Sequence, residues 1–384
     1  MRVLQVVPYF SPRMGGVARV VYDMARHLSH RGHDITIVAG DYKQDEASFP
    51  PGEFRQVLLR SVFSRWGFYY TPSLVAWMRD HVAEFDVIHL HEVRTFQNSV
   101  ARRYALRYGI PYVLSAHGTL PVIVQRKLAK RIYDLLVGRR LLASASGLVA
   151  VSALEAEQYR LAGGIEEGRI RVIYNGLDLD EFSPLPSRGL LRQKLGIPRE
   201  APLVLFLGRL HRIKGIDFLV KAFARLREEV KETILVIAGP DEGELDHLRA
   251  LAGRLGLEES VRFAGPLYGQ DKLAAYVDAD VVASPGAYEI FGLVPFEALM
   301  CGTPVVINSG SGASRLLGDT EAAYRVPYGD LPALTAVLQQ ALTDGVASQR
   351  LVANGQGFVR TRLDWQAIAA RVEGLYAEAV GSGG

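Results

Sequence analysis

Residues 286–304 read GAYEIFGLVPFEALMCGTP. The segment before them predicts a buried strand that ends in a turn, and the second half of the stretch predicts a short helix with Pro295 in its first turn. Glu289 then lies in the strand-to-helix loop, and Glu297 lies about one turn into the helix. Gly292 allows backbone N–H groups to approach an anion at the helix N-terminus. The stretch therefore predicts a pocket that holds a phosphate-bearing sugar by its hydroxyls and its phosphates.

The length and composition predict a globular chain of two domains. A chain of 384 residues is too long for one ordinary core. The longest apolar runs fall short of the ~18–20 residues of a membrane-spanning helix, and the N-terminus has neither the long apolar segment nor the cleavage site of a signal peptide. A single cysteine, Cys301, fits a reducing compartment. We therefore expect a cytoplasmic protein, and a net charge of only +3 gives no reason to expect a nucleic-acid partner.

Short β-branched runs alternate with helical stretches along the whole chain, which predicts parallel sheets with crossover helices. The strands expected in the first half are residues 3–7, 34–38, 87–90, 112–115, 147–151 and 171–173. Those expected in the second half are residues 203–207, 234–238, 261–263, 281–283 and 304–307. The predicted fold class is α/β, with two Rossmann-like domains. Ligands of such sheets gather at the carboxyl ends of the strands.

Two basic side chains follow the first strand of the second half. In the segment FLGRLHRIKG, Arg209 and Lys214 leave the strand end within one loop. A nucleoside diphosphate leaving group gains negative charge as its bond to the sugar breaks, so fixed cations stabilise the transition state more than the ground state. We therefore interpret Arg209 and Lys214 as ligands of a diphosphate.

The two glutamates, with Phe291-Gly292 after the first and EALMCGTPVV from the second onward, resemble the E-x7-E signature of retaining GT-B glycosyltransferases, most closely glycosyltransferase family 4. The Gly-Arg-Leu-x3-Lys-Gly segment around Arg209 and Lys214 resembles the diphosphate-binding segment of the same family. The resemblance extends over essentially the whole chain and is strongest from Leu203 to Ile307. It implies two parallel-sheet domains that face each other across a cleft.

The resemblance also implies an assignment of domains. Residues 1–181 would form the Rossmann-like domain on the acceptor side, and residues 182–362 the Rossmann-like domain for the nucleotide-sugar donor. Residues 363–384 would form a C-terminal helix that crosses back to the first domain.

The roles of individual residues follow from the same resemblance. The catalytic candidates are Arg209, Lys214, Glu289 and His117. The donor-binding candidates are Gly16, Arg209, Lys214, Gly265, Leu267, Glu289, Phe291, Gly292, Leu293 and Glu297. Glu289 would bind the hydroxyls of the donor sugar and Glu297 those of the ribose. His117, in Ser-Ala-His-Gly-Thr at a strand end, would face the sugar, while His89 and His91 are interpreted as packing or acceptor-side residues.

We expect neither a cofactor nor an essential metal. The Asp178-Leu-Asp180 and Asp278-Ala-Asp280 triplets look like metal–diphosphate motifs, but the first lies in the connection between domains and the second opens a buried strand. The sequence departs from the family pattern in two places. It carries Asp-Glu after Gly239-Pro240, which leaves the base and sugar of the donor open. It also carries NSGSGAS from Asn308, which leaves the role of that loop open.

A basic region accounts for the positive charge. Residues 101–140 hold nine Lys or Arg and one acidic residue, Asp134. Within it an amphipathic helix is predicted over residues 124–137. Its apolar positions are Val124, Leu128, Ile132, Leu135 and Leu136, and its basic positions are Arg126, Lys127, Lys130 and Arg131. The helix is either an ordinary surface helix or a contact with anionic lipid headgroups or a polyprenyl-diphosphate acceptor on the inner face of the cell membrane.

The expected activity is transfer of a hexose-type sugar, with retention, from a nucleoside diphosphate to the hydroxyl of a glycan or lipid-linked acceptor, as in the synthesis of envelope polysaccharides or glycolipids. Two alternatives remain. A nucleotide-sugar 2-epimerase of the same fold would convert the donor without an acceptor. A non-catalytic subunit of polysaccharide assembly would not bind the donor.

Overall fold

The computed structural model describes residues 1–42, 48–65, 68–122, 127–162 and 164–381. The chain divides into two compact units, the first formed by Met1–Gly176 with Trp365–Gly384, and the second by Leu177–Asp364. Each unit is an α/β layer structure, which confirms the predicted fold class.

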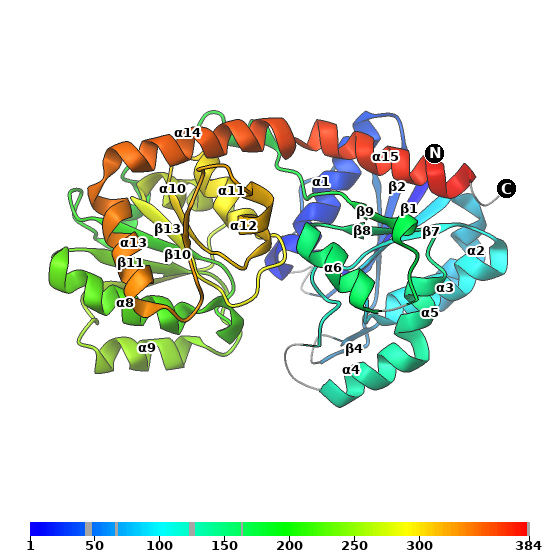
Figure 1. Cartoon of the computed structure of the whole chain (residues 1–384). Helices are drawn as coiled ribbons and strands as arrows, with labels where there is room; N and C mark the ends of the chain where they lie inside the picture. The colour runs from blue at the N-terminus through cyan, green and yellow to red at the C-terminus, as the bar shows by residue number, and fades with distance from the viewer. Residues whose placement is uncertain (43–47, 66–67, 123–126, 163, 382–384) are drawn as a thin grey trace. The chain divides into compact units, whose positions relative to one another are not determined.

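The first unit, whose sheet is drawn in blue to green in Figure 1, is built on parallel strands. The sheet has seven strands in the order β3-β2-β1-β6-β7-β8-β9. The strands are β1 (Arg2–Tyr9), β2 (Asp34–Gly40), β3 (Arg55–Leu59), β6 (Val87–His91), β7 (Tyr112–Ser115), β8 (Gly147–Ala150) and β9 (Ile170–Val172). Each of the six strands predicted for the first half is present, with slightly shifted ends. The edge strand β3 was not predicted, nor was the small antiparallel pair β4 (Phe63–Arg65) and β5 (Phe68–Tyr70).

Helices cover both faces of this sheet. They are α1 (Gly16–His30), α2 (Ser73–His81), α3 (Phe96–Tyr108), α4 (Lys127–Tyr133), α5 (Arg139–Ala143), α6 (Ala153–Ala162) and α15 (Trp365–Gly381). The C-terminal helix α15 packs beside α1, with the rings of Trp365 and His27 stacked at 5.9 Å. Two nitrogens of Arg31, Nε and Nη2, donate to the same oxygen of Glu373 and tie the same two segments.

The second unit contains a six-stranded parallel sheet in the order β12-β11-β10-β13-β14-β15. Its strands are β10 (Leu203–Leu207), β11 (Ile234–Ala238), β12 (Val261–Gly265), β13 (Val281–Ser284), β14 (Val305–Asn308) and β15 (Tyr324–Val326). The first five agree with the predicted strands, and the three-residue β15 was not predicted.

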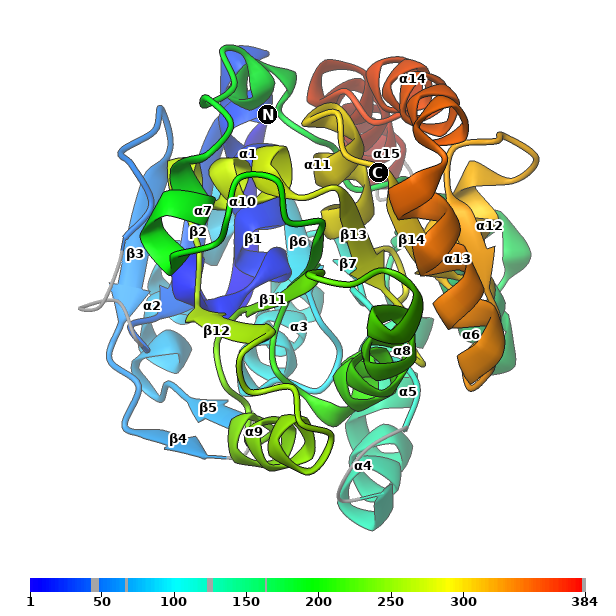
Figure 2. The ribbon, with the colours of Figure 1, turned by 90° about the vertical axis from the view of Figure 1, so that its left-hand side faces the viewer.

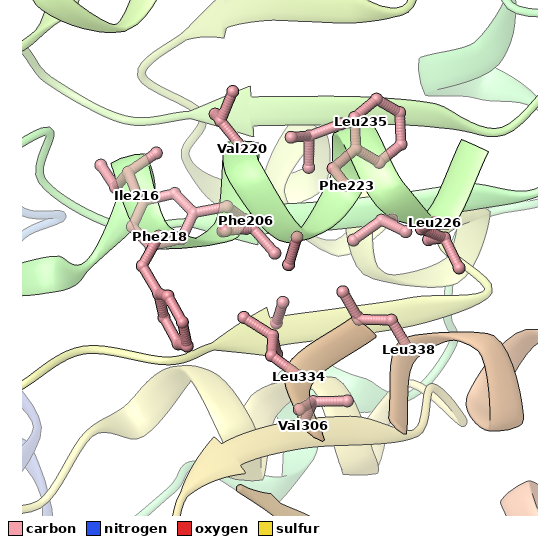
Figure 3. Close-up of a cluster of buried hydrophobic side chains, with 14 of the residues drawn as sticks. Phe206, Ile216, Phe218, Val220, Phe223, Leu226, Leu235, Val306, Leu334 and Leu338 are labelled. Atoms are coloured by element: carbon pink, nitrogen blue, oxygen red, sulfur yellow. The ribbon is translucent and has the colours of Figure 1, made fainter. Parts of the chain in front are cut away.

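The helices of the second unit are α7 (Leu190–Leu195), α8 (Ile216–Glu229), α9 (Leu245–Arg254), α10 (Gly269–Asp278), α11 (Leu293–Met300), α12 (Gly312–Leu317), α13 (Leu331–Thr343) and α14 (Gly345–Arg362). Figure 2 shows α8 and α13 side by side. Apolar side chains of both helices, among them Leu226, Leu334 and Leu338, belong to one buried cluster, and the ring of Phe223 points toward Leu235 of β11 (Figure 3). This core fixes the strand ends from which the candidate site residues extend.

Candidate functional site

The loop after β10 presents the two predicted diphosphate ligands. It continues through the short 3₁₀ helix η7 (Arg212–Lys214) to Gly215, the N-cap residue of α8, which has a left-handed conformation at φ 66°. A Cβ on Gly215 would lie 3.1 Å from the Tyr328 ring and 3.3 Å from the Pro285 carbonyl oxygen. Both the conformation and the close approach therefore require glycine here.

Lys214 and Glu289 come together at this point. The turn after β13 is hydrogen-bonded to the η7 turn, because the Ala287 N–H donates to the Ile213 carbonyl at 3.0 Å. This contact places the Lys214 ammonium against the Glu289 carboxylate, to which it donates a hydrogen bond. Both side chains are about one-fifth exposed, at 20% and 23%. The pair is therefore half-buried and remains within reach of a ligand.

The loop that carries Glu289 is held at its far end by a close contact between backbones. Gly292, the N-cap residue just before α11, has φ 76°. The N–H of Gly312, at the start of α12, donates to the Glu289 carbonyl at 2.8 Å. A Cβ on Gly312 would lie 1.7 Å from the carbonyl oxygen of Ile290, so no other residue fits without displacing the loop. The side chain of Phe291 is buried against Phe296, with ring centroids 5.4 Å apart.

Glu297 lies in the second turn of α11, and both of its carboxylate oxygens have partners on α10. Lys272 Nζ donates to Oε1 at 2.8 Å, and the Tyr276 hydroxyl donates to Oε2 at 2.7 Å. A carboxylate offers about four lone pairs, so it can accept more hydrogen bonds than the two from Lys272 and Tyr276. Burial and the neighbouring carboxylate raise the pKa of Tyr276 well above its ordinary value, which keeps the phenol a donor. The sequence reading missed Lys272 and Tyr276.

Arg209 is paired with Glu242, one of the two residues that depart from the family pattern. Its Nη1 lies 2.8 and 2.7 Å from the two carboxylate oxygens. The pair can form because the ends of β10 and β11 approach each other closely. This close approach depends on Gly239, where a Cβ would lie 1.8 Å from the Gly208 carbonyl oxygen. Both partners are substantially exposed, at 48% and 36%. Water screens such a pair, so an incoming phosphate can replace the carboxylate.

The carboxyl ends of β11 and β12 supply backbone groups. Gly265 ends β12 in a left-handed conformation at φ 71°, and its carbonyl accepts from the Gly239 N–H at 2.8 Å. Leu267, two residues on, is buried. The structure therefore brings Gly265 to the strand end beside the one from which Glu242 follows.

The two aspartates of the Asp278-Ala-Asp280 triplet are held in structural hydrogen bonds. Asp278 accepts backbone N–H groups from Gly189 and Arg192. Asp280 accepts from Arg192 at 3.0 Å and from the Leu203 N–H at 2.8 Å. Within the described part of the chain, no group of three or more His, Cys, Asp or Glu side chains has the arrangement of a metal site.

In the first unit, the glycine loop after β1 opens α1. Gly15 has φ 95°, and Gly16 is the first residue of the helix. Gly16 is exposed, and a Cβ built on it would meet nothing within 4 Å. The helix N-terminus is therefore open to an approaching anion.

His117 follows β7 in a left-handed conformation, with φ 50°, and Gly118 continues the turn at φ 80°. A buried carboxylate holds this turn, since Glu155 accepts the N–H of Gly118 at 2.5 Å and that of Val151 at 2.8 Å. Burial raises the pKa of Glu155 to about 7, although the two N–H donors act in the opposite direction. The left-handed conformation costs an L-residue about 1 kcal/mol or more, which is typical of functional positions.

The basic segment is helical, but it is interrupted. The described part runs through α4, a π-helical turn η4 (Asp134–Gly138) and α5, whereas one regular helix over residues 124–137 was predicted. Val124 and Arg126 lie outside the described residues. π-helical turns often occur at functional sites.

The predicted apolar positions of this segment face outward. Leu128, Ile132, Leu135 and Leu136 are 73%, 50%, 63% and 61% exposed. Leu135 also lines a cavity of about 570 Å³ together with Arg131, Arg139 and Leu161. Among the described residues, no helix is both long and apolar enough to span a bilayer.

Comparison with known proteins identifies the family. Residues 187–358 match the family described as Glycosyl transferases group 1, and residues 14–181 match Glycosyltransferase Family 4. A phosphatidyl-myo-inositol mannosyltransferase of Mycobacterium leprae is 31% identical over 397 residues, which cover 100% of this chain and 98% of that protein. A D-inositol 3-phosphate glycosyltransferase of Xylanimonas cellulosilytica is 34% identical over 305 residues, 77% of this chain and 72% of that protein.

Solved structures share the fold. Sucrose-phosphate synthase from Thermosynechococcus elongatus superposes with a TM-score of 0.82 at 24% identity, over 100% of both chains. HepE from Anabaena, in complex with UDP and glucose, superposes with a TM-score of 0.80 at 23% identity, over 98% of this chain and 99% of that one. The chain has the GT-B fold and belongs to glycosyltransferase family 4, a family of GT-B glycosyltransferases.

Proposed function

We propose that this chain is a retaining glycosyltransferase that moves a hexose-type sugar from a nucleoside diphosphate to an acceptor hydroxyl. The observation that carries the proposal is the half-buried Lys214–Glu289 pair at the strand ends of the second unit. It combines a cation for a diphosphate with a carboxylate for sugar hydroxyls. The opening of α11 at Gly292 lies three residues from the same carboxylate.

Different residues of the second unit bind different parts of the donor. Lys214 and Arg209 bind the diphosphate, Arg209 after exchanging Glu242 for a phosphate oxygen. Glu289 accepts hydrogen bonds from the sugar, and backbone N–H groups at Phe291, Gly292 and Leu293 face the phosphates. Glu297 accepts from the ribose hydroxyls while Lys272 and Tyr276 hold its orientation. The base lies against the backbone at Gly265 and Leu267.

The reaction we propose is a front-face substitution. The bond between the anomeric carbon and the phosphate oxygen breaks, and the acceptor oxygen forms its bond on the same face of the sugar. The proton of the acceptor hydroxyl passes to the leaving phosphate. Lys214 and Arg209 stabilise the charge that develops on that phosphate. Since Glu289 is engaged by Lys214, its role is to bind and orient the sugar rather than to attack it.

We propose that Lys214 and Arg209 supply the positive charge that an essential metal ion would otherwise bring. The Asp278 and Asp280 carboxylates do not offer a metal site, because they are committed to structural hydrogen bonds. The function is tested by incubating the protein with UDP-, GDP- and ADP-sugars and candidate acceptors in the presence of EDTA. D-inositol 3-phosphate and phosphatidyl-myo-inositol come first among the acceptors, because the names of the two relatives contain them.

The readout is the anomeric configuration of the product by NMR. Transfer with retention in EDTA is expected. Conversion of the donor without an acceptor would favour the epimerase, an inverted product would contradict the front-face reaction, and the absence of donor binding would favour a non-catalytic subunit.

The open space at Gly16 gives a specific prediction. Gly16→Ala is expected to leave the melting temperature unchanged or slightly higher, since alanine favours the helix and its Cβ meets nothing. It is expected to weaken donor binding about tenfold, because the methyl group takes the space through which a phosphate reaches the backbone N–H groups. Calorimetric titration measures the affinity. Gly374→Ala, at an equally open position in α15, is the control, and equal affinities for the two variants would remove Gly16 from the site.

We propose that the exposed apolar residues of α4 and η4 contact a membrane that contains the acceptor, with Lys127, Lys130 and Arg131 near anionic headgroups. Clustered exposed leucines are uncommon on a monomeric surface and mark interaction sites. Arg126, a further basic position of the predicted helix, lies outside the described residues.

Vesicle flotation tests this surface. The double variant Leu128→Ser, Leu136→Ser is expected to lose more than tenfold in binding to vesicles containing anionic lipid, because each inserted leucine contributes about 1.5–3 kcal/mol. Leu255→Ser, at a 40% exposed leucine of the second unit, is the control. Unchanged partition of the double variant would exclude this surface.

A further inference from the structure

Three imidazole rings lie in a row at the carboxyl ends of β6 and β7. The rings of His89 and His91 stack with centroids 4.2 Å apart, and those of His91 and His117 with centroids 5.2 Å apart. His89 has a hydroxyl on each side, with Nδ1 2.7 Å from the Tyr376 oxygen and Nε2 2.7 Å from Ser115 Oγ. His91 is completely buried. Its two nitrogens are therefore cut off from solvent, and their hydrogen bonds must come from the protein.

The only hydrogen bond that the described residues offer the His91 ring is with His117. His91 Nδ1 lies 2.9 Å from His117 Nε2, whereas His91 Nε2 has no partner in the described part of the chain. The backbone of His91 is fixed as well, because the Asn98 side chain donates to its carbonyl at 3.0 Å. Among the described residues, His117 is therefore the one hydrogen-bond partner of this ring.

The proton in the hydrogen bond between His91 and His117 can be placed because both rings are neutral at pH 7. Burial lowers the pKa of His117 to about 4, and burial with the neighbouring rings lowers the pKa of His91 well below its ordinary value. Each ring then carries one N–H at pH 7, and only one proton lies between His91 Nδ1 and His117 Nε2.

Two arrangements satisfy that contact. If His117 donated, the proton of His91 would lie on Nε2, which would bury an N–H without an acceptor. If His91 donates, only a lone pair remains unpaired at Nε2. An orphaned buried N–H is the rarer and costlier state. His91 therefore donates, and His117 carries its own proton on Nδ1.

We propose that His91 is a positioning residue of the transfer reaction, which donates from Nδ1 to His117 Nε2 and so keeps the proton of His117 on Nδ1, ready to donate to a hydroxyl of the donor sugar. The proposal rests on the proposed function of His117 as a sugar contact. The backbone cooperates, since the left-handed turn at His117 and Gly118 is clamped by Glu155. His91 sets the protonated nitrogen, and Glu155 sets the direction of the turn.

The experiment compares His91→Asn with His91→Leu, because the asparagine and leucine side chains both branch at Cγ and have similar shapes. In His91→Asn the amide can donate a hydrogen bond from near the Nδ1 position, whereas His91→Leu cannot donate. Protein labelled with ¹⁵N-histidine reports the tautomer of His117 by NMR, with the signals assigned through His117→Ala. We expect the Nδ1–H tautomer in the wild type and in His91→Asn, and a shift toward Nε2–H in His91→Leu.

The kinetic expectation is parallel. His91→Leu should lower kcat/KM for transfer roughly tenfold, about the effect of one lost hydrogen bond, and His91→Asn should restore most of it. Adding His91→Leu to His117→Ala should cause little further loss, because His91 acts only through His117. Melting temperatures identify any general loss of folding, and the asparagine variant keeps the comparison valid if the leucine variant unfolds.

Two results would overturn the proposal. One is an unchanged His117 tautomer in a folded His91→Leu protein. The other is full activity of His117→Ala, which would remove the sugar contact on which the proposal rests. Failure of the proposed function is a separate outcome, because it shows as a wild-type protein that binds no nucleotide sugar, whereas the tautomer is read without any donor.

Discussion

Lys214→Met is expected to reduce kcat about 10²–10³-fold, the usual effect of removing one preorganised group that stabilises developing charge. The ammonium faces Glu289 in a half-buried position, where its charge is screened less than on the open surface. Methionine retains most of the length of the side chain and removes only the cation. The measurement is the initial rate of transfer at saturating donor, together with the donor affinity from calorimetry.

Lys221→Met is the matched control for this prediction. Lys221 also pairs with a carboxylate, Asp217, at 3.2 Å, but on the exposed face of α8. Its loss is expected to change the rate less than twofold. A Lys214→Met protein that kept both the wild-type rate and the wild-type affinity would remove Lys214 from the reaction.

Gly312→Ala is expected to cost the second unit about 3 kcal/mol of unfolding free energy and to abolish most of its donor binding. A Cβ would lie 1.7 Å from the carbonyl oxygen of Ile290, so the backbone must move, and overpacking of this kind costs about 1–3 kcal/mol or more. The movement also breaks the hydrogen bond from Gly312 to the Glu289 carbonyl. The melting temperature and the affinity for the donor should therefore both decrease in this variant.

Gly310→Ala separates this effect from a general sensitivity of the loop. It lies two residues earlier, and its nearest contact would be an ordinary 3.5 Å to Asn308 Oδ1. We expect near wild-type stability and affinity for this variant. A Gly312→Ala protein as stable as Gly310→Ala would show that the close approach of α12 to the Glu289 loop is not required.

The sequence predicted the fold because most of the buried strands consist mainly of apolar residues. In β10 and β11 every residue but Leu207 is buried, and such strands of parallel sheets are legible without alternation. The edge strand β3 has no fully buried residue, and β4, β5 and β15 have three residues each. Strands that are so short or so incompletely buried give a weak signal in the sequence, so they were missed.

Part of the candidate site could be predicted from the sequence for a different reason. Lys214, Glu289 and Glu297 lie in short segments whose spacing is characteristic of the family, whereas the partners of Glu297 come from another helix. Lys272 and Tyr276 are four residues apart on one face of α10, a spacing that indicated only a shared side of the helix.

The remaining pairings depend on tertiary contacts. The Arg209–Glu242 pair needs the close approach of two strand ends at Gly208 and Gly239. The link between His91 and His117 needs two neighbouring strands in register, since His91 pairs with Ser115 across β6 and β7.

The central claim is that this chain binds a nucleoside-diphosphate sugar through Lys214 and Glu289. Calorimetric titration of wild type, Lys214→Met and Glu289→Gln with UDP-, GDP- and ADP-sugars tests it most directly. We predict that at least one sugar nucleotide binds the wild type with one-to-one stoichiometry, and that both variants lose at least tenfold in affinity for it. Wild-type protein that binds none of them, or variants that bind as the wild type does, would contradict the claim.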